Sequence, residues 1–128
     1  MSEERSWAQV YYSALSGLTH DGEPVPVNQN TAPGDPDTGR APDTYVTFNQ
    51  AEEDYVESSS NLPRRTRHLV QVHFVSLRPE AVRPLMKQAR TALRAAGIRP
   101  RYCAALMHEE DTGYWHLPMY TWYLDKDV

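Results

Sequence analysis

Five histidines are the residues in this chain best suited to metal binding or to acid–base chemistry: His20, His68, His73, His108 and His116. A zinc site needs two or three such ligands converging about 2 Å from the ion, and the chain contains no HxH or HExxH spacing. His73, His108 and His116 fall on three different predicted strands and could meet across a sheet. Such a meeting is more often a hydrogen-bonded surface group than a ligand set, so we predict no metal and no other cofactor.

Cys103 is the only cysteine, which excludes an internal disulfide and argues against a thiolate metal site. It lies in the apolar stretch RYCAALM with no helix N-terminus to activate it, so we predict a buried, inert thiol. A lone thiol suits synthesis in a reducing cytoplasm. GxSxG, P-loop and GxGxxG patterns are absent from the chain.

Two acidic groups lie beside predicted turns: Glu52, Glu53 and Asp54, and then Glu109, Glu110 and Asp111. Either group could supply a general acid or base, but solvated loop charge is the favoured interpretation. The basic run RRTR at 64–67 is too short to predict nucleic-acid binding. No catalytic constellation emerges, and the chain is not predicted to be an enzyme.

Size and composition are those of a single globular domain over residues 1–128. The net charge of −4 argues against a broad phosphate-binding surface, without excluding a local basic patch. No run of eighteen apolar residues occurs, so no transmembrane helix is expected. Glu3 and Glu4, with no long apolar core after them, argue against a signal peptide.

Two helices are predicted from apolar residues at helical spacing. The first covers Ser6–Leu18, with Ser6 as N-cap and Gln9 in the capping-box position. The second covers Glu80–Ala96, between Pro79 at its first position and Gly97 as C-cap. Pro84 should kink this helix or delay its first turn. The apolar stripe of the second helix consists of Val82, Leu85, Met86, Ala89, Leu93 and Ala96.

The strands are predicted from period-two alternation. They are a weak edge strand at 25–29, strands at 44–49 and 67–76, and two final strands, RYCAALMHEE and GYWHLPMYTWYL, joined by an Asp-Thr-Gly turn. A Pro- and Gly-rich loop at 28–43 either docks on a partner or is a surface excursion. We therefore predict an α+β fold, in which a mostly antiparallel sheet of four to five strands packs against two helices. Its core should join Val70, Val72 and Phe74 to five residues of the second helix: Val82, Leu85, Met86, Ala89 and Leu93.

The last strand is apolar on both faces. Tyr120, Trp122 and Leu124 point one way, while Leu117, Met119, Thr121 and Tyr123 point the other way. An antiparallel sheet in a monomer normally leaves one face polar. Either the first helix covers the second face, or a neighbouring subunit does, since exposed aromatic and Met surface is typical of interfaces.

The order of these segments resembles the tail terminator and tail-completion family of long-tailed bacteriophages over nearly the whole chain. Three stretches carry the resemblance. PDTYVTF at 42–48 matches a proline followed by an aromatic–valine strand. QVHF at 71–74 matches a polar-alternating strand, with His73 where an acid is common. Residues 109–123 match an aromatic-rich final strand that follows an acidic turn.

The resemblance implies a structural virion protein without catalytic residues. It would form a ring, expected to be a hexamer, at the head-proximal end of the tail, in the neck of the virion, after synthesis in the host cytoplasm. The ring would contact the tail tube protein and the head–tail connector or stopper, and DNA would pass through it without specific binding. No membrane contact is implied, and the roles of tail terminator and head–tail stopper both remain open.

Within this interpretation, the last strand and the long loop are the expected subunit or partner interface: Leu117, Met119, Tyr120, Trp122, Tyr123, Pro33, Pro36 and Arg40. Glu52, Glu53 and Asp54 would supply lumen or loop charge. The alternative is a small dimeric α+β enzyme or ligand-binding module, with an enclosed pocket that uses His73, His108 and Tyr102.

Overall fold

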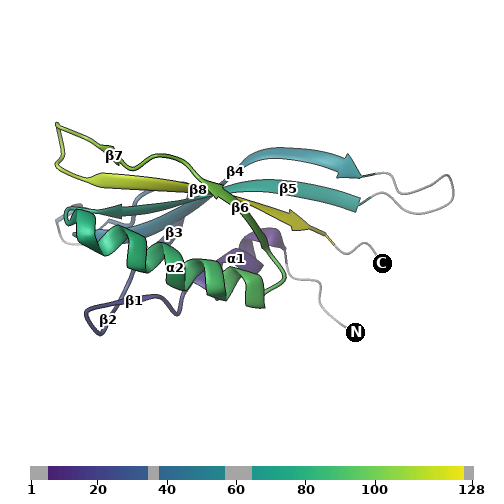
Figure 1. Cartoon of the computed structure of the whole chain (residues 1–128), viewed down its shortest axis with the longest axis horizontal. Helices are drawn as coiled ribbons and strands as arrows, with labels where there is room; N and C mark the ends of the chain where they lie inside the picture. The colour runs from purple at the N-terminus through teal and green to yellow at the C-terminus, as the bar shows by residue number, and fades with distance from the viewer. Residues whose placement is uncertain (1–5, 35–37, 57–64, 126–128) are drawn as a thin grey trace, which may run out of the picture.

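The structure is a computed structural model that describes residues 6–34, 38–56 and 65–125. The fold is α+β, with two helices and a mostly antiparallel sheet (Figure 1). In chain order the elements are α1 (Trp7–Leu15), β1 (Thr19–His20), β2 (Glu23–Pro24), β3 (Val27–Gln29), β4 (Thr44–Val56), β5 (Arg65–Ser76), α2 (Pro79–Ala95), β6 (Arg99–Cys103), β7 (Met107–His108) and β8 (Trp115–Leu124).

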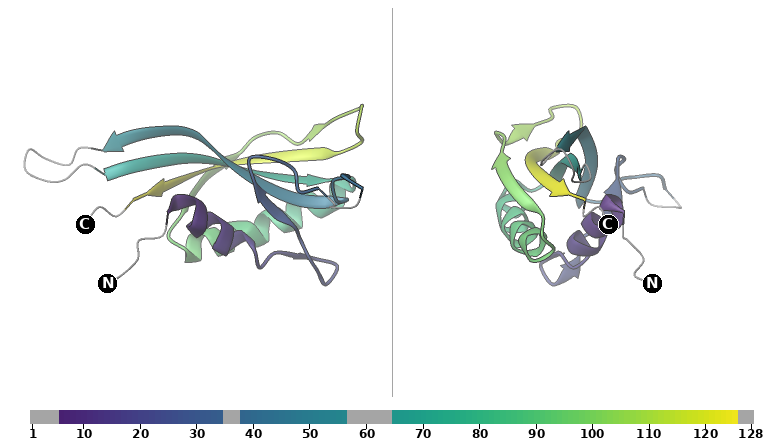
Figure 2. Two further views of the ribbon diagram at one scale, coloured as in Figure 1. Left: turned by 180° about the vertical axis from the view of Figure 1, so that it is seen from behind. Right: turned by 90° about the vertical axis from the view of Figure 1, so that its right-hand side faces the viewer.

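The main sheet has the strand order β3-β4-β5-β8-β6, and β7 also pairs with β8. Only β3 runs parallel to its neighbour, while the other pairs are antiparallel. The two best-patterned strands, β5 and β8, are therefore central, and the weak strand expected near residues 25–29 lies at an edge. Figure 2 shows both helices on one side of this twisted sheet.

The core lies between the sheet and the helices. Val70, Val72 and Phe74 of β5 are fully buried in one cluster with Val82, Leu85, Met86, Ala89 and Leu93 of α2, which confirms the predicted core. Ala96, the last residue of the predicted stripe, follows the helix and is exposed. Cross-strand register places Leu117 and Met119 of β8 opposite Phe74 and Val72, on the same helix-facing side. A helical stripe and a period-two strand face thus bury each other, as their spacing predicts.

Helix α1 begins as predicted and ends early. Ser6 and Gln9 form the reciprocal capping box, with each side chain bonded to the other residue's backbone N–H. The helix ends at Leu15 instead of Leu18. It packs beside α2 on the helix-facing side, where Tyr11 is fully buried. The interpretation that α1 covers the opposite face of the sheet is therefore wrong.

Helix α2 begins at Pro79 and continues through Pro84, so the internal proline does not delay the first turn. Its C-terminus is closed by two backbone bonds, from Gly97 N to Arg94 O and from Ile98 N to Leu93 O. Gly97 has φ +84°, and Ile98 is buried. This is the Schellman arrangement, in which a left-handed residue satisfies the last carbonyl groups of a helix.

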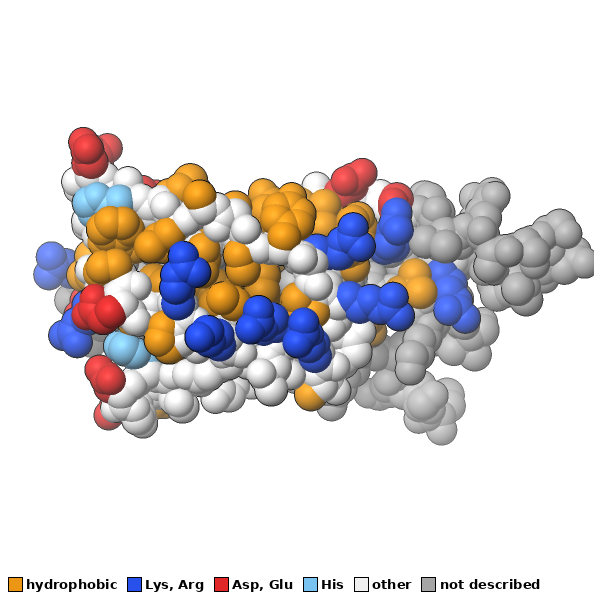
Figure 3. Space-filling view, in the orientation of Figure 1, with side chains coloured by type: hydrophobic (Ala, Val, Ile, Leu, Met, Phe, Trp, Pro, Cys, Tyr) orange, Lys and Arg blue, Asp and Glu red, His pale blue; other side chains and the backbone are white. Residues whose placement is uncertain are grey.

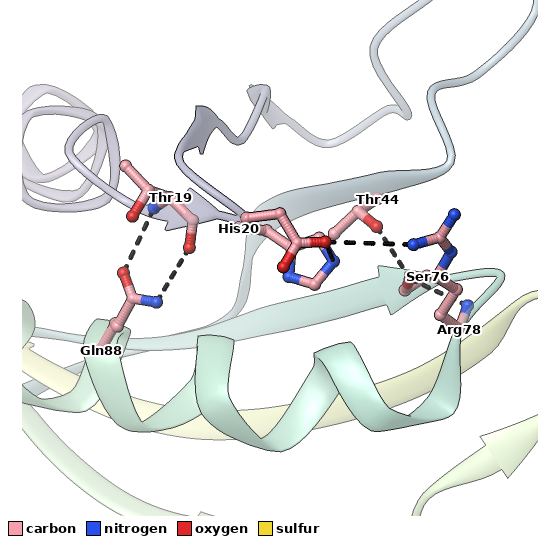
Figure 4. Close-up of polar contacts among 7 residues, drawn as sticks. Thr19, His20, Thr44, Ser76, Arg78 and Gln88 are labelled. Carbon is pink, nitrogen blue, oxygen red and sulfur yellow. Dashed lines mark hydrogen bonds and ion pairs between the residues drawn. The ribbon is translucent and has the colours of Figure 1, made fainter.

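Polar contacts attach the β1–β2 hairpin and the start of α2 to the rest of the fold (Figure 4). The Gln88 side chain accepts a bond from Thr19 N at 3.2 Å and donates one to Thr19 O at 2.9 Å. The Ser76 hydroxyl accepts from Arg78 N at 3.0 Å and bonds the Thr44 hydroxyl at 2.8 Å. These contacts connect α2 to β1, β4 and β5.

Several strands differ from their predicted bounds. β3 begins at Val27 and not at residue 25, and β5 begins at Arg65 and not at Arg67, but β4 and β6 differ most. The strand expected at 44–49 continues to Val56, past a register shift between Gln50 and Glu52, so Glu52, Glu53 and Asp54 lie within β4 and not in a loop. The strand expected over RYCAALMHEE divides into β6 and β7, with no strand at 104–106. Within the described residues, no helix is long and apolar enough to cross a membrane.

Candidate functional site

The side of the sheet opposite the helices, here called the open face, is the candidate interaction surface. The register places on it the alternate residues of three long strands: Tyr45, Thr47 and Asn49 of β4, Leu69, Gln71, His73 and Val75 of β5, and His116, Pro118, Tyr120, Trp122 and Leu124 of β8. Neither helix covers this face, although Tyr45, Val75 and Pro118 on it are buried by other segments of the chain. The predicted alternation of the last strand is confirmed, and its Tyr120–Trp122–Leu124 side is the open one.

An arginine hollow lies at one end of the open face. It has a volume of about 470 Å³ and is lined by Arg65, Arg67, Gly97, Arg99, Arg101, Trp122 and Leu124. The guanidinium carbon of Arg67 lies 4.4 Å from the centroid of the Trp122 ring, and that of Arg101 lies 5.9 Å from it. Cation–π contact therefore holds these side chains around the tryptophan.

The charge of the hollow is only partly neutralised. Arg67 donates two bonds to the Asp54 carboxylate, at 2.9 and 2.5 Å. Hydrogen bonding from Arg67 lowers the pKa of Asp54, and the same contact raises the pKa of Arg67. In the part of the chain that the structure describes, no ion pair neutralises Arg65, Arg99 or Arg101. The hollow therefore suits an anionic group.

Exposed aromatic and aliphatic surface extends from the hollow along β6. Tyr102 is 60% exposed and stacks on Tyr120, with ring centroids 4.7 Å apart. Figure 3 shows hydrophobic side chains beside a row of Lys and Arg side chains over α2, with more basic side chains past the C-terminal end of that helix. This mixture of aromatic residues and arginine is the composition of protein interfaces.

A histidine hollow of about 550 Å³ lies at the other end of the open face. Its lining includes His73, His108 and His116, so the sheet brings these three histidines to one hollow. Tyr102 does not line it, and the hollow is open to solvent. The enclosed pocket of the enzyme alternative, built from His73, His108 and Tyr102, is therefore not formed as expected.

The histidines of this hollow are engaged by neighbouring groups. His116 Nε2 lies 3.0 Å from Glu109 Oε1, and His108 stacks on Trp115 at 4.3 Å. Burial lowers the pKa of His73, and the nearby His116 lowers it further. Among the described residues, no group of three His, Cys, Asp or Glu side chains is arranged to hold a metal ion.

Cys103 is exposed on β6, so the prediction of a buried thiol is wrong. The residue lies on the strand at the sheet edge. Partial burial raises the pKa of its thiol, although Arg90 and Arg83 act in the opposite direction. A raised pKa disfavours the reactive thiolate.

His68, a buried histidine for which the sequence predicted no role, lies on the helix-facing side. Its Nε2 is 2.8 Å from Asp125 Oδ2, and its Nδ1 contacts the Gln50 side chain. Trp7 and Tyr123 stack on its ring. His68 is 3% exposed, and no Ser or Cys side chain contacts it among the described residues. We therefore assign it the structural role of joining α1, β4 and the end of β8.

The expected interface residues do not form one surface. Tyr120 and Trp122 lie on the open face, whereas Leu117 and Met119 are buried in the protein's own core. Tyr123 is on the helix-facing side, near Tyr11. Pro33 is half-buried and Arg40 is exposed in the long loop, and Pro36 lies outside the described residues.

The acids expected to supply lumen or loop charge also divide between the two sides of the sheet. Glu52 and Asp54 pair with Leu69 and Arg67 across the open face. Glu53 lies on the helix-facing side, where its Oε1 is 3.7 Å from His68 Nδ1.

The arginines of the hollow were not predicted as a group. Arg65 and Arg67 lie on β5, and Arg99 and Arg101 lie on β6, the two strands that flank β8. A signal was present for Arg99 and Arg101 alone, because residues 81–108 contain no Asp or Glu. The sequence did not indicate which strands would be neighbours.

No known protein family matches the chain, and no curated protein sequence matches it. Among solved structures, the fold is similar to a protein chain in the virion of a native gene transfer agent particle. The TM-score is 0.41 at 12% sequence identity, over 92% of this chain and 85% of the other. A likeness this remote assigns neither a family nor a function.

Proposed function

We propose that this chain is a structural virion protein that forms a ring at the head-proximal end of a phage tail, where it ends the tail tube and joins it to the head connector. The observation that carries this proposal is the open face. Both helices lie on the other side of the sheet, and aromatic and arginine side chains gather on the open face near the end of β8.

The chemistry of the open face favours a protein partner over a catalytic role. Trp122 and Tyr120 are half-buried and Tyr102 is exposed, so this surface stays in contact with water unless another chain covers it. Trp, Tyr and Arg are the residue types that most often carry binding energy at interfaces. Among the described residues, no cysteine lines the histidine hollow, and no group of side chains there is arranged to hold a metal ion.

A ring requires two different patches on each copy, because heterologous contacts close only when unlike surfaces meet. The chain has distinct surfaces of this kind. The arginine hollow lies at one end of β8, and the β7–β8 hairpin and the long loop lie toward the other end. Tyr114 connects these last two, since its hydroxyl donates a bond to Pro42 O at 2.8 Å.

The direct test is to delete the gene from its phage and image the particles by electron microscopy. We expect filled heads separate from tails, and tails of irregular length, because nothing would end the tube or join it to the head. Expression of the wild-type chain in trans should restore joined particles. Particles of normal appearance in the deletion strain would contradict the proposal.

A second test concerns the loop. Deletion of Ala32–Arg40 should leave a folded protein and reduce the joining of tails to heads, because proline-rich loops lose less entropy on docking. If this variant joins tails as well as the wild type does, the loop takes no part in the contact. A substitution at the exposed Glu23, on the β1–β2 hairpin, is the matched control and should have no effect.

A further inference from the structure

Charge is segregated along this chain. Residues 81–108 contain no Asp or Glu and six basic residues: Arg83, Lys87, Arg90, Arg94, Arg99 and Arg101. The chain as a whole nevertheless has a net charge of −4. The other segments therefore carry a large acidic excess.

The arginine hollow is the most concentrated basic surface. Arg65, Arg99 and Arg101 surround Trp122 without a carboxylate partner among the described residues, while Arg67 is occupied by Asp54. Guanidinium groups present a planar fork of donors that fits a carboxylate in a bidentate way. Arg67 already lies over the Trp122 ring, which leaves the free guanidinium groups, and not the ring, to receive a ligand.

The tip of the β7–β8 hairpin supplies the matching acids. Glu109 is engaged by Thr112 and His116, whereas Glu110 and Asp111 are exposed and form no ion pair within the described chain. Backbone bonds from Gly113 N to Glu109 O and from Glu109 N to Tyr114 O hold the tip in shape. A preorganised tip loses little conformational entropy when it docks.

The tip and the hollow lie at opposite ends of β8. The strand begins at Trp115, beside the tip, and ends at Leu124, which lines the hollow. Figure 1 shows the β7–β8 connection and the end of β8 on opposite sides of the molecule. One copy therefore cannot bring the two together, whereas two adjacent copies in a head-to-tail arrangement can.

We propose that the hairpin tip of one copy, through Glu110 and Asp111, docks in the arginine hollow of the next copy. The partner of the hollow is then a second copy of this chain. The contact rests on the ring of the proposed function and gives it a specific subunit interface. Aromatic surface beside the hollow, at Tyr102 and Tyr120, is covered by the same neighbour.

The test is a charge reversal on each side of the contact. Arg99→Glu with Arg101→Glu makes the hollow acidic, and Glu110→Arg with Asp111→Arg makes the tip basic. Each double variant alone opposes like charges, so we expect its dissociation constant to rise about tenfold or more. Sedimentation velocity and native mass spectrometry measure the association of each purified protein.

The decisive experiment mixes the two double variants in equal amounts. Every contact between unlike variants again joins opposite charges, so association should return and the two chains should alternate in rings of even number. A quadruple variant that carries both reversals should also associate. Restoration of this kind cannot result from general misfolding of either variant.

A matched control changes charge elsewhere. Arg83→Glu with Lys87→Glu alters two exposed basic residues of α2 by the same total charge, outside the hollow. This variant should associate like the wild type. Circular dichroism and thermal unfolding of all variants confirm that each is folded.

The possible outcomes separate this inference from the proposed function. Equal association of the wild type and both reversals would overturn the contact and leave a ring built by another interface. A wild-type chain that stays monomeric up to about 1 mM would also overturn it. If the wild type binds duplex DNA and Arg99→Glu with Arg101→Glu abolishes that binding without changing self-association, the hollow is a nucleic-acid site and the contact is wrong.

Discussion

Two buried hydroxyl groups connect α1 to the centre of the sheet. The Thr121 hydroxyl donates to Val70 O at 3.0 Å, and the Tyr11 hydroxyl bonds the same Thr121 oxygen. Both side chains are fully buried, and burial raises the pKa of Tyr11 well above its usual range, which keeps the phenol protonated. The two hydroxyl groups have unequal roles, because the Thr121 hydroxyl contacts both Tyr11 and Val70 O, whereas among the described residues the Tyr11 hydroxyl bonds Thr121 alone.

The consequence at these residues is an asymmetry between two substitutions. Tyr11→Phe removes one hydroxyl and leaves Thr121 bonded to Val70 O, so it should cost about 1 kcal/mol. Thr121→Val removes both hydroxyl contacts and leaves the buried Tyr11 hydroxyl without its partner, so it should cost about 2–3 kcal/mol. Urea unfolding of both variants measures the difference. Equal losses would mean that the hydroxyl chain does not contribute as the geometry implies.

His73 should make stability depend on pH. Its pKa is lowered from 6.5 in the folded protein, mainly by burial, so below pH 6.5 the unfolded chain binds a proton that the folded chain resists. The contribution of His73 to the free energy of unfolding is therefore fully present above pH 6.5, and it is lost as the pH decreases toward the folded pKa. His116, Glu109 and Tyr45 line the same hollow, and the variant used to test His73 leaves these three residues unchanged.

The measurement is urea unfolding at several pH values from about 8 to about 5, for the wild type and for His73→Gln. The variant cannot take up a proton there, so its stability should fall less over this range. The pKa of Glu109 is lowered from 4.5, mainly by a hydrogen bond from Thr112, so this residue should affect stability only at lower pH, and equally in both proteins. Parallel profiles for the two proteins would exclude His73 as the source.

At the scale of elements, the end of α2 depends on one glycine. Gly97 has φ +84°, where a Cβ is disfavoured, so Gly97→Ala should cost about 1–2 kcal/mol. Gly17, after α1, lacks positive φ and has no atom within 4 Å of the position that an alanine methyl group would occupy, so Gly17→Ala should be neutral or stabilise by about 0.4–1 kcal/mol. Thermal unfolding of both variants tests this, and a harmless Gly97→Ala would show that the Schellman closure is not required.

The elements predictable from sequence were those in which local pattern and packing agree. The capping box at Ser6, the stripe of α2 and the alternation of β5 each had a period that the structure repeats. The length of β4 was not predictable, since Glu52 and Asp54 suit a loop by composition. They lie in a strand because Leu69 and Arg67 are their cross-strand partners, and such pairs form only in the assembled sheet.

The candidate site, too, was predictable only where it depends on the local pattern of one strand. The two apolar sides of β8 followed from alternation, including the placement of Trp122 and Tyr123 on opposite sides. The arginine hollow did not, because its arginines come from two segments about thirty residues apart that are brought together only through the sheet order. Which side of β8 faces the helices also depends on where α1 packs.

At the scale of the whole molecule, the position of both helices on one side of the sheet gives β8 two separate tasks. Tyr123 packs in the helix-facing core, with its ring centroid 6.3 Å from that of Tyr11 and 6.3 Å from that of His68. Trp122 lies on the open face beneath Arg67. Adjacent residues of one strand therefore serve the folding of the chain and its contact with a neighbour.

Alanine substitution at each position should separate these tasks. Tyr123→Ala removes a partly buried ring from the core and should lower the free energy of unfolding by about 1–3 kcal/mol. Trp122→Ala should leave a folded protein and weaken assembly by about 2 kcal/mol or more, as expected for a central aromatic anchor. Urea unfolding gives the first quantity, and the fraction of tails joined to heads, after complementation of a deletion phage, gives the second. If Trp122→Ala folds and joins tails as well as the wild type, the open face is not the assembly surface, whatever the effect at Tyr123.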